Sequence, residues 1–402
     1  MVGSFRPTTM RISISWHLHQ LLFLAFITVG GVAQTLKVES VPNPSPTGSM
    51  EAHWAVTQDG SPLLSWIEPA KGGSYALRYS IRRNGQWSEA RTIVTNRRFF
   101  RQPAESPSVI AFPSGGMLAE WVEVPNDSSE TEYIYVSASN DGVQWTTPVM
   151  ANKDRSPVQH ALVSMAVSGD REASLVWLEA LKGEDAPSHL KRTVISSEGK
   201  VLKEEDLDPD VCTCCPTTIV KTSRGLLVAY RDHTSEDVRD IAVIRFEKGR
   251  WAPSKVLNPD KWQINACPVN GAFAAADGDR VAIAWYTEGG DKPRVQLAFS
   301  ADAGATFAKP IVVNTGDALG HASVVLTDDG GAFASWIEEG EKSSRILARF
   351  VSVSGAAGPP VLIAEGSTRS LGYPRLLQVR KETWITWGNS AEGRVQTARL
   401  TK

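Results

Sequence analysis

One short signature occurs seven times along this chain: an apolar strand ends in an aromatic residue, and an acid follows within two or three places in six of the seven copies. The aromatic residues are Trp66, Trp121, Trp177, Tyr230, Trp285, Trp336 and Trp387. The residues that follow them are Glu68, Glu123, Glu179, Asp232, Glu288, Glu338 and, in the last copy, Asn389. Successive aromatic residues are 55, 56, 53, 55, 51 and 51 residues apart. A steady period of about 50 residues with several short strands is typical of a β-propeller blade.

Each repeat contains short apolar segments separated by turn residues, as expected for a blade of four strands. In the second repeat the expected strands cover 108–112, 118–122 and 133–139, and a fourth begins near Trp145. The last repeat has only three clear strands, so we expect residues 35–41 to supply its fourth. Strands from both chain ends would then close the ring without an exposed edge. The sequence predicts one all-β domain over residues 34–402, a β-propeller of seven four-stranded blades. Six blades with an irregular terminal hairpin is the alternative.

The first 33 residues resemble a secretory signal peptide. Arg6 and Arg11 supply positive charge, residues 21–27 are apolar, and Ala33 ends a run of small residues suited to cleavage. An uncleaved membrane anchor is the alternative, although the apolar stretch is short for a span. We therefore expect a mature protein that begins at Gln34 and is periplasmic or secreted, where thiols tend to be oxidised.

The composition is that of a globular protein, with 42% hydrophobic and 21% charged residues. The 42 basic and 44 acidic residues give a net charge of −2, and no basic tract stands out. This balance argues against a nucleic acid partner. No second candidate for a membrane span follows the N-terminal segment. We expect a monomer whose ligand is a small molecule, a glycan or a metal ion.

Residues 300–307 read Ser-Ala-Asp-Ala-Gly-Ala-Thr-Phe, and residues 138–145 are a degenerate copy. Shorter relics end at Trp87 and Trp251. The complete copy resembles the Asp-box of sialidase-like, or BNR-repeat, propeller proteins, with its motif residues at Ser300, Asp302, Gly304 and Phe307. Such a turn suits these residue types, because Asp bonds the backbone and Gly accepts an unusual conformation. The motif lies on the face away from the expected site, so it bears on fold and not on catalysis.

The resemblance implies a sialidase-type propeller, six-bladed in the family, and an exo-sialidase type of glycoside hydrolysis. Sialidases use a Phe/Tyr–Arg–Ile–Pro motif, an arginine triad that binds the substrate carboxylate, a Tyr/Glu pair and an Asp acid. This chain departs from that pattern, because the nearest stretch, around Arg101, has Gln102 where Ile belongs. The catalytic residues that the resemblance offers are Arg231, Asp232, Tyr373 and Arg375.

A second set of positions repeats with the same period, at the expected starts of the innermost strands. These positions are His53, Ser106, His160, Cys215, Cys267, His321 and Tyr373, with spacings of 53, 54, 55, 52, 54 and 52. In a propeller they converge on the mouth of the central channel. Cys212 and Cys214 come just before this ring.

Imidazoles and thiolates that converge from different strands suit a transition metal. The sequence therefore offers His53, His160, Cys212, Cys214, Cys215, Cys267 and His321 as ligands of copper or zinc. The alternative is that four cysteines in a secreted chain form two disulfides. Cys215–Cys267 would then join neighbouring blades.

The top loop of the fourth blade is the richest in charged residues. It carries Arg231, Asp232, His233 and Arg239, followed by Asp240, beside the cysteines. Arg231, Asp232, His233 and Arg239 are the expected ligand-binding residues, because arginines suit an anion. Pairing of the arginines with Asp232 and Asp240, which would brace the loop, is the alternative.

Three functions follow from these residues. The first is a secreted sialidase-like propeller that binds a ligand, with or without a metal, at its top face and lacks sialidase chemistry. The second is a true exo-sialidase, which needs an arginine clamp and carboxylates on that face. The third is a non-catalytic scaffold that presents loops to a partner.

Overall fold

Seven antiparallel sheets, one for each repeat, follow one another along the chain in the computed structural model. The structure describes residues 1–4, 36–126, 130–181, 188–389 and 393–401. In the first six sheets the strands pair in sequence order, beginning at the innermost strand. The seventh sheet ends in β1 (Lys37–Ser40), which pairs with β30 (Arg394–Thr401) from the other end of the chain. The predicted seven-bladed propeller and its closure by the N-terminal strand are confirmed, and the six-bladed alternative is wrong.

The first four blades contain the following strands. The first has β2 (Met50–Val56), β3 (Pro62–Pro69), β4 (Tyr75–Arg83), β5 (Gln86–Trp87) and β6 (Arg91–Arg97), with the short 3₁₀ helix η1 (Lys71–Gly73). The second has β7 (Ser108–Ala111), β8 (Met117–Glu123), β9 (Tyr133–Ser139) and β10 (Val149–Met150). The third has β11 (His160–Gly169), β12 (Glu172–Ala180), β13 (Ser188–Ser196) and β14 (Val201–Val211). The fourth has β15 (Thr218–Thr222), β16 (Gly225–Arg231), β17 (Ile241–Glu247), β18 (Arg250–Trp251) and β19 (Lys255–Val256).

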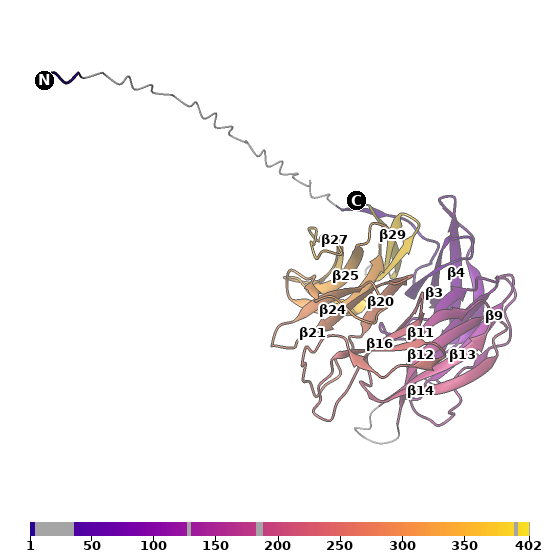
Figure 1. The fold of residues 1–402 in the computed structure, drawn as a ribbon. Coiled ribbons are helices and arrows are strands. Elements are labelled where there is room, and N and C mark those ends of the chain that lie inside the picture. Colours follow the sequence, from indigo (N-terminus) through magenta and orange to yellow (C-terminus); the bar gives the residue numbers. More distant parts are fainter. Residues whose placement is uncertain (5–35, 127–129, 182–187, 390–392, 402) are drawn as a thin grey trace. The chain divides into compact units, whose positions relative to one another are not determined.

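The last three blades complete the ring, and Figure 1 shows the purple strands of the first blade beside the yellow strands of the last. The fifth has β20 (Ala272–Asp277), β21 (Arg280–Thr287), β22 (Arg294–Ser300) and β23 (Ile311–Val312). The sixth has β24 (Ala318–Leu326), β25 (Ala332–Glu339), β26 (Ser344–Val351) and β27 (Val361–Gly366), followed by the one-turn helix α1 (Thr368–Leu371). The seventh has β28 (Arg375–Val379), β29 (Glu382–Asn389), β30 and β1.

The propeller is one of two units into which the chain divides, Met1–Ala33 and Gln34–Lys402. The segments that suggested a signal peptide lie within residues 5–35, outside the described residues. Among the residues that the structure describes, no helix is long and apolar enough to cross a membrane.

The recurring acids are hydrogen-bond acceptors for the recurring tryptophans. Alternate residues of a strand project from the same face, so an acid two places after a tryptophan lies beside its ring. Glu68 accepts the indole N–H of Trp66 at 2.7 Å, and Glu338 accepts that of Trp336 at 2.8 Å. Glu123 does the same for Trp121. These three acids stand at the ends of second strands, yet their hydrogen bonds to the indoles build them into the packing between blades.

The turn at residues 300–307 has the hydrogen bonds expected of an Asp-box. Asp302 accepts the backbone N–H of Thr306 at 2.9 Å, and the Ser300 hydroxyl accepts the N–H of Gly304 at the same distance. Gly304 has a φ of +78°, and a Cβ there would lie 2.1 Å from Leu227 of the fourth blade. Only glycine fits, because the turn packs directly on the neighbouring blade.

Loss of a signature acid should destabilise the propeller. Glu338 is 1% exposed and also accepts the backbone N–H of Thr315 at 2.7 Å. Glu338→Ala would leave the buried indole N–H of Trp336 and the backbone N–H of the exposed Thr315 without this acceptor, so the free energy of unfolding should fall by about 1–3 kcal/mol in a denaturant titration. The exposed Glu341→Ala serves as the control and should change it by less than about 0.5 kcal/mol. Equal effects of the two substitutions would contradict this account.

Candidate functional site

The seven innermost strands enclose one central channel. Every blade contributes to a cavity of about 240 Å³ along the axis, from residues near His53, Ser108, Met165, Ile219, Phe273, Val324 and Leu376. The side chains that face it are mainly apolar or small, so the channel is an extension of the core. Polar and charged groups gather instead where the innermost strands begin.

The predicted ring positions lie at or near the beginnings of these strands, but their side chains do not form one centre. His321 Nδ1 donates to the Gly372 carbonyl at 2.8 Å, and its ring stacks on Tyr373 with the ring centroids 3.9 Å apart. Burial, with Arg375 nearby, lowers the pKa of His53 to about 3. Among the described residues, no group of three candidate ligands combines a histidine with a cysteine. The ring therefore divides into separate local environments.

Two of the four cysteines form a disulfide, and the other two are free. The pair is Cys214–Cys267, which joins the fourth and fifth blades with a Cα–Cα distance of 6.0 Å. The expected pairing of Cys215 with Cys267 was wrong. Cys214 and Cys215 lie in a turn and bend before β15, and Cys215 is buried in the interior at 2% exposure with its sulfur against Cys212. The disulfide also removes the thiolates of Cys214 and Cys267 from any metal site.

The free thiols of Cys212 and Cys215 lie against each other, with their sulfur atoms 3.5 Å apart. This hydrogen bond, assisted by the Cys214 N–H and by the charges of Arg231 and Arg239, lowers the pKa of Cys212 well below the usual range of a thiol. Burial raises the pKa of Cys215 instead. The pair therefore holds one thiolate beside one thiol.

Removing the disulfide should destabilise the fold without changing its architecture. The bridged residues are 53 positions apart, for which the chain-entropy relation gives about 4 kcal/mol. The double variant Cys214→Ser/Cys267→Ser should lose about 2–4 kcal/mol of unfolding free energy. Alkylation of the denatured, unreduced wild type should label Cys212 and Cys215 only. Labelling of all four, or of none, by mass spectrometry would contradict the assigned pairing.

Arg231, which we expected to bind a ligand, is buried and holds neighbouring segments together through hydrogen bonds. It is 2% exposed and lies over the Trp262 ring at 4.8 Å. Its guanidinium donates to the carbonyls of Asn270, Arg239 and Tyr286 at 2.6–2.9 Å. Four of its five N–H donors are used within the protein, so the geometry does not support a role in anion binding.

The rest of this loop is also internally paired. Arg239 donates to the Cys212 sulfur at 3.5 Å and lies 3.5 Å from Asp237. Asp240 accepts two backbone N–H groups, from Lys261 and Trp262. The bracing alternative therefore describes the loop, although the partners differ from those expected. Burial raises the pKa of Asp232 to about 6.

His233 lies between two carboxylates. Its Nδ1 is 2.7 Å from Asp210, and its Nε2 is 3.2 Å from Asp237. Burial acts to lower the pKa of His233, but the two hydrogen bonds outweigh it and raise the pKa above the ordinary value. The two carboxylates favour the charged form of the histidine, which ties β14 to the loop after β16.

The contribution of His233 to stability should depend on pH. Because its folded-state pKa is raised, the stabilisation is complete below about pH 6.5 and is lost as the pH rises through the folded-state value. The difference in unfolding free energy between the wild type and His233→Gln should shrink between pH 6.5 and alkaline pH. An NMR titration of the imidazole gives the folded-state pKa directly. A difference that grows with pH would contradict the assignment.

A second hollow lies on the top face between the seventh, first and second blades. It has a volume of about 230 Å³, and its wall includes Glu51, Arg101, Arg369, Tyr373 and Trp387. Arg101 and Arg369 are exposed, and neither forms an ion pair with a carboxylate among the described residues. Arg101 donates to the Tyr75 hydroxyl at 2.8 Å, which leaves most of its donors free. We refer to this hollow as the arginine pocket.

Two buried polar groups in the arginine pocket have no partner within the described part of the chain. They are one carboxyl oxygen of Glu51 and the indole N–H of Trp387. Burial, with Glu105 nearby, raises the pKa of Glu51 well above its usual range. Unpaired buried polar groups are uncommon and costly, and a bound ligand would satisfy them.

A buried charge cluster supports the pocket from below. Arg375 is attracted to Glu105, Glu120 and Glu51, and burial lowers its pKa. Glu105 accepts the backbone N–H of Val163 at 3.2 Å, and burial raises its pKa to about 7. The raised pKa values favour the neutral forms of these acids, which reduces the negative charge beneath the pocket arginines.

The structure brings together only part of the set expected from the sialidase resemblance. Arg101 and Tyr373 share the arginine pocket, and Arg375 lies beside it. Arg231, Asp232, His233 and Arg239 belong to the fourth blade and do not contribute to this pocket. The Tyr373 hydroxyl donates to the Val269 carbonyl, and burial raises its pKa, so its geometry does not support a nucleophile. The sequence analysis did not identify Glu51 or Arg369 as site residues. Arg369 lies in α1, in the connection between the sixth and seventh blades, where the repeat has no recurring position that could identify it.

Comparison with solved structures supports the fold. An ulvan lyase, a polysaccharide lyase, superposes with a TM-score of 0.55 at 10% identity, covering 89% of this chain and 95% of that one. An α-L-arabinofuranosidase from Fusarium graminearum gives a TM-score of 0.48 at 12% identity, covering 90% and 98%. The NanB sialidase from Streptococcus pneumoniae gives 0.42 at 11% identity, covering 90% and 70%. No protein-family model matches the chain, and no curated protein does.

Proposed function

We propose that this protein is a carbohydrate-binding propeller that takes an acidic sugar, with its carboxylate held by Arg101 and Arg369, in the arginine pocket. One observation carries the proposal. The walls of a single hollow combine two exposed arginines that have no carboxylate partner with two residues that each have a buried polar atom without a hydrogen-bond partner. Arginine matches a carboxylate in shape and charge, because its donors form a planar fork.

The remaining walls suit a sugar ring. Tyr373 and Trp387 offer aromatic surface, and the carboxyl group of Glu51 is able to form a hydrogen bond with a hydroxyl. The volume of about 230 Å³ is below the range of sites for drug-sized ligands, which fits a single sugar unit. The ulvan lyase of similar fold is known bound to a repeat of glucuronic acid and rhamnose sulfate, an acidic glycan. This likeness supports the ligand class by analogy of fold.

Export to the periplasm or beyond is part of the proposal. The N-terminal segment resembles a signal peptide, and the Cys214–Cys267 disulfide suits an oxidising compartment. Acidic polysaccharides of the cell exterior would be accessible there.

Calorimetric titration with glucuronic acid, galacturonic acid and N-acetylneuraminic acid tests the assignment, with glucose and galactose as neutral controls. At least one acid should bind, and Arg101→Ala or Arg369→Ala should weaken it about 10- to 100-fold, the value of a charge-assisted hydrogen bond. Arg171→Ala is the matched control, because Arg171 is exposed and pairs with Glu198 at the turn between β11 and β12. Equal binding of acid and neutral sugars, or no effect of either pocket substitution, would refute the assignment.

Hydrolysis of a fluorogenic sialoside separates this proposal from the exo-sialidase alternative. We expect no turnover, because Tyr373 lacks a carboxylate partner for its hydroxyl and Arg231 is sequestered. Turnover that disappears in Tyr373→Phe would favour the alternative.

A further inference from the structure

The third blade breaks the signature of the repeat in one respect. Trp177 and Glu179 occupy the same positions as the tryptophan–acid pairs of the first, second and sixth blades. Yet the indole N–H of Trp177 is buried without an acceptor, and Glu179 turns away from it. The acid is therefore available for another partner.

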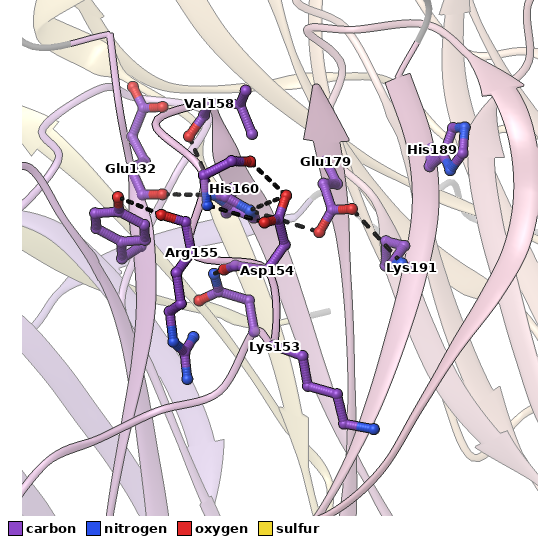
Figure 2. Close-up of polar contacts among 12 residues, drawn as sticks. Glu132, Lys153, Asp154, Arg155, Val158, His160, Glu179, His189 and Lys191 are labelled. Carbon is purple, nitrogen blue, oxygen red and sulfur yellow. Dashed lines mark hydrogen bonds and ion pairs between the residues drawn. The ribbon is translucent and has the colours of Figure 1, made fainter. Parts of the chain in front are cut away.

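That partner is His160 on the neighbouring strand. His160 and Glu179 are directly paired in the register of β11 and β12, so their side chains share one face of the sheet. His160 Nε2 lies 3.5 Å from Glu179 Oε2 and 3.9 Å from Asp154 Oδ2 (Figure 2). His160 is fully buried and Glu179 is 7% exposed, whereas the Asp154 side chain is 43% exposed.

The protonation of His160 is fixed by its other ring nitrogen. Nδ1 lies 2.8 Å from the Glu132 carbonyl and 3.1 Å from the Val158 carbonyl. A carbonyl only accepts, so Nδ1 carries a proton, and Nε2 is the ring nitrogen that faces the two carboxylates and is placed to bind a metal ion. Nε2 and Glu179 Oε2 are both buried without a hydrogen-bond partner. A carbonyl that orients a histidine in this way is typical of metal sites.

From these contacts we infer that Asp154, His160 and Glu179 form a binding site for one divalent transition-metal ion, of the zinc or manganese class. One imidazole with two carboxylates suits these ions, whereas the site offers no thiolate. Ligand atoms about 2.1 Å from a tetrahedral zinc lie roughly 3.4 Å apart, close to the separations found here. All three ligand atoms lie within 4.8 Å of one another.

Neighbouring groups hold the two carboxylates in place. Lys191 lies 3.5 Å from Glu179 Oε1, the oxygen that does not face His160, and Lys191 is also held 2.8 Å from Asp206. The half-exposed Asp154 lies on the solvent side, and its carboxylate accepts from the Ser156 N–H at 2.9 Å. Three protein ligands are the number found in catalytic zinc sites. This site is separate from the arginine pocket and goes beyond the proposed function.

Metal binding to the full-length protein tests the inference. After dialysis against chelator and then buffer, calorimetric titration with Zn²⁺ alone should show one ion bound per chain, and a parallel titration with Mn²⁺ ranks the two ions. Asp154→Asn and Glu179→Gln keep the side-chain size and should each weaken zinc binding at least about tenfold. Glu68→Gln, which changes the equivalent acid of the first blade, is the matched control and should leave binding unchanged.

The free thiols are the competing zinc site, so Cys212→Ser/Cys215→Ser is measured alongside. This variant should bind zinc as the wild type does, and the Co²⁺-loaded wild type should show d–d bands without a thiolate charge-transfer band. Circular dichroism checks that each variant is folded. Absence of zinc binding, full binding by either carboxylate variant, or loss of binding in the thiol variant would overturn the inference. Sugar binding at the arginine pocket is read independently, so failure of either assignment is distinguishable from failure of the other.

Discussion

The hydrogen bond from a buried indole N–H to the carboxylate two residues further along the same strand is the contact on which the packing of the blades depends. A tryptophan fills the space between neighbouring sheets, but its N–H must find an acceptor there, because an unpaired buried donor is costly. The acid at the next residue on that face supplies it, as in Trp66–Glu68 and Trp336–Glu338. The pair fixes the register of the second strand and brings a carboxylate to the top of the blade, next to the loops.

This arrangement makes departures from the repeat informative. Where the acid keeps its tryptophan, it belongs to the scaffold. In the third blade Glu179 faces His160 instead, and in the seventh blade Trp387 has an unpaired N–H in the wall of the arginine pocket. Both sites thus use the positions that elsewhere hold the blades together. The indole–carboxylate hydrogen bonds are kept in the first, second and sixth blades, so the propeller tolerates their absence in the third and seventh.

The charged loop of the fourth blade shows the opposite case. It has the composition of a binding site, with arginines, acids, a histidine and thiols in a short stretch. The structure uses nearly all of them internally: Arg231 binds three carbonyls, His233 bridges two carboxylates, and Cys214 joins the next blade. Composition alone did not show whether these side chains bind a ligand or stabilise the loop. The same residue types do either, depending on which groups lie opposite them in the folded protein.

The sequence by itself determined the number of blades, their boundaries, the closing strand and the face on which polar residues gather. These follow from period and strand alternation, which are properties of the chain read in order. The tertiary structure decided which residues meet across blades. The pairing of Cys214 with Cys267, the sequestration of Arg231 and the convergence of Glu51, Arg101 and Arg369 depend on side-chain direction at the strand ends and on irregular connections. A bulge or a single-residue shift reverses the direction of a side chain without changing the period of the repeat. The repeat therefore predicts on which face of the propeller the site lies, but not which residues form it.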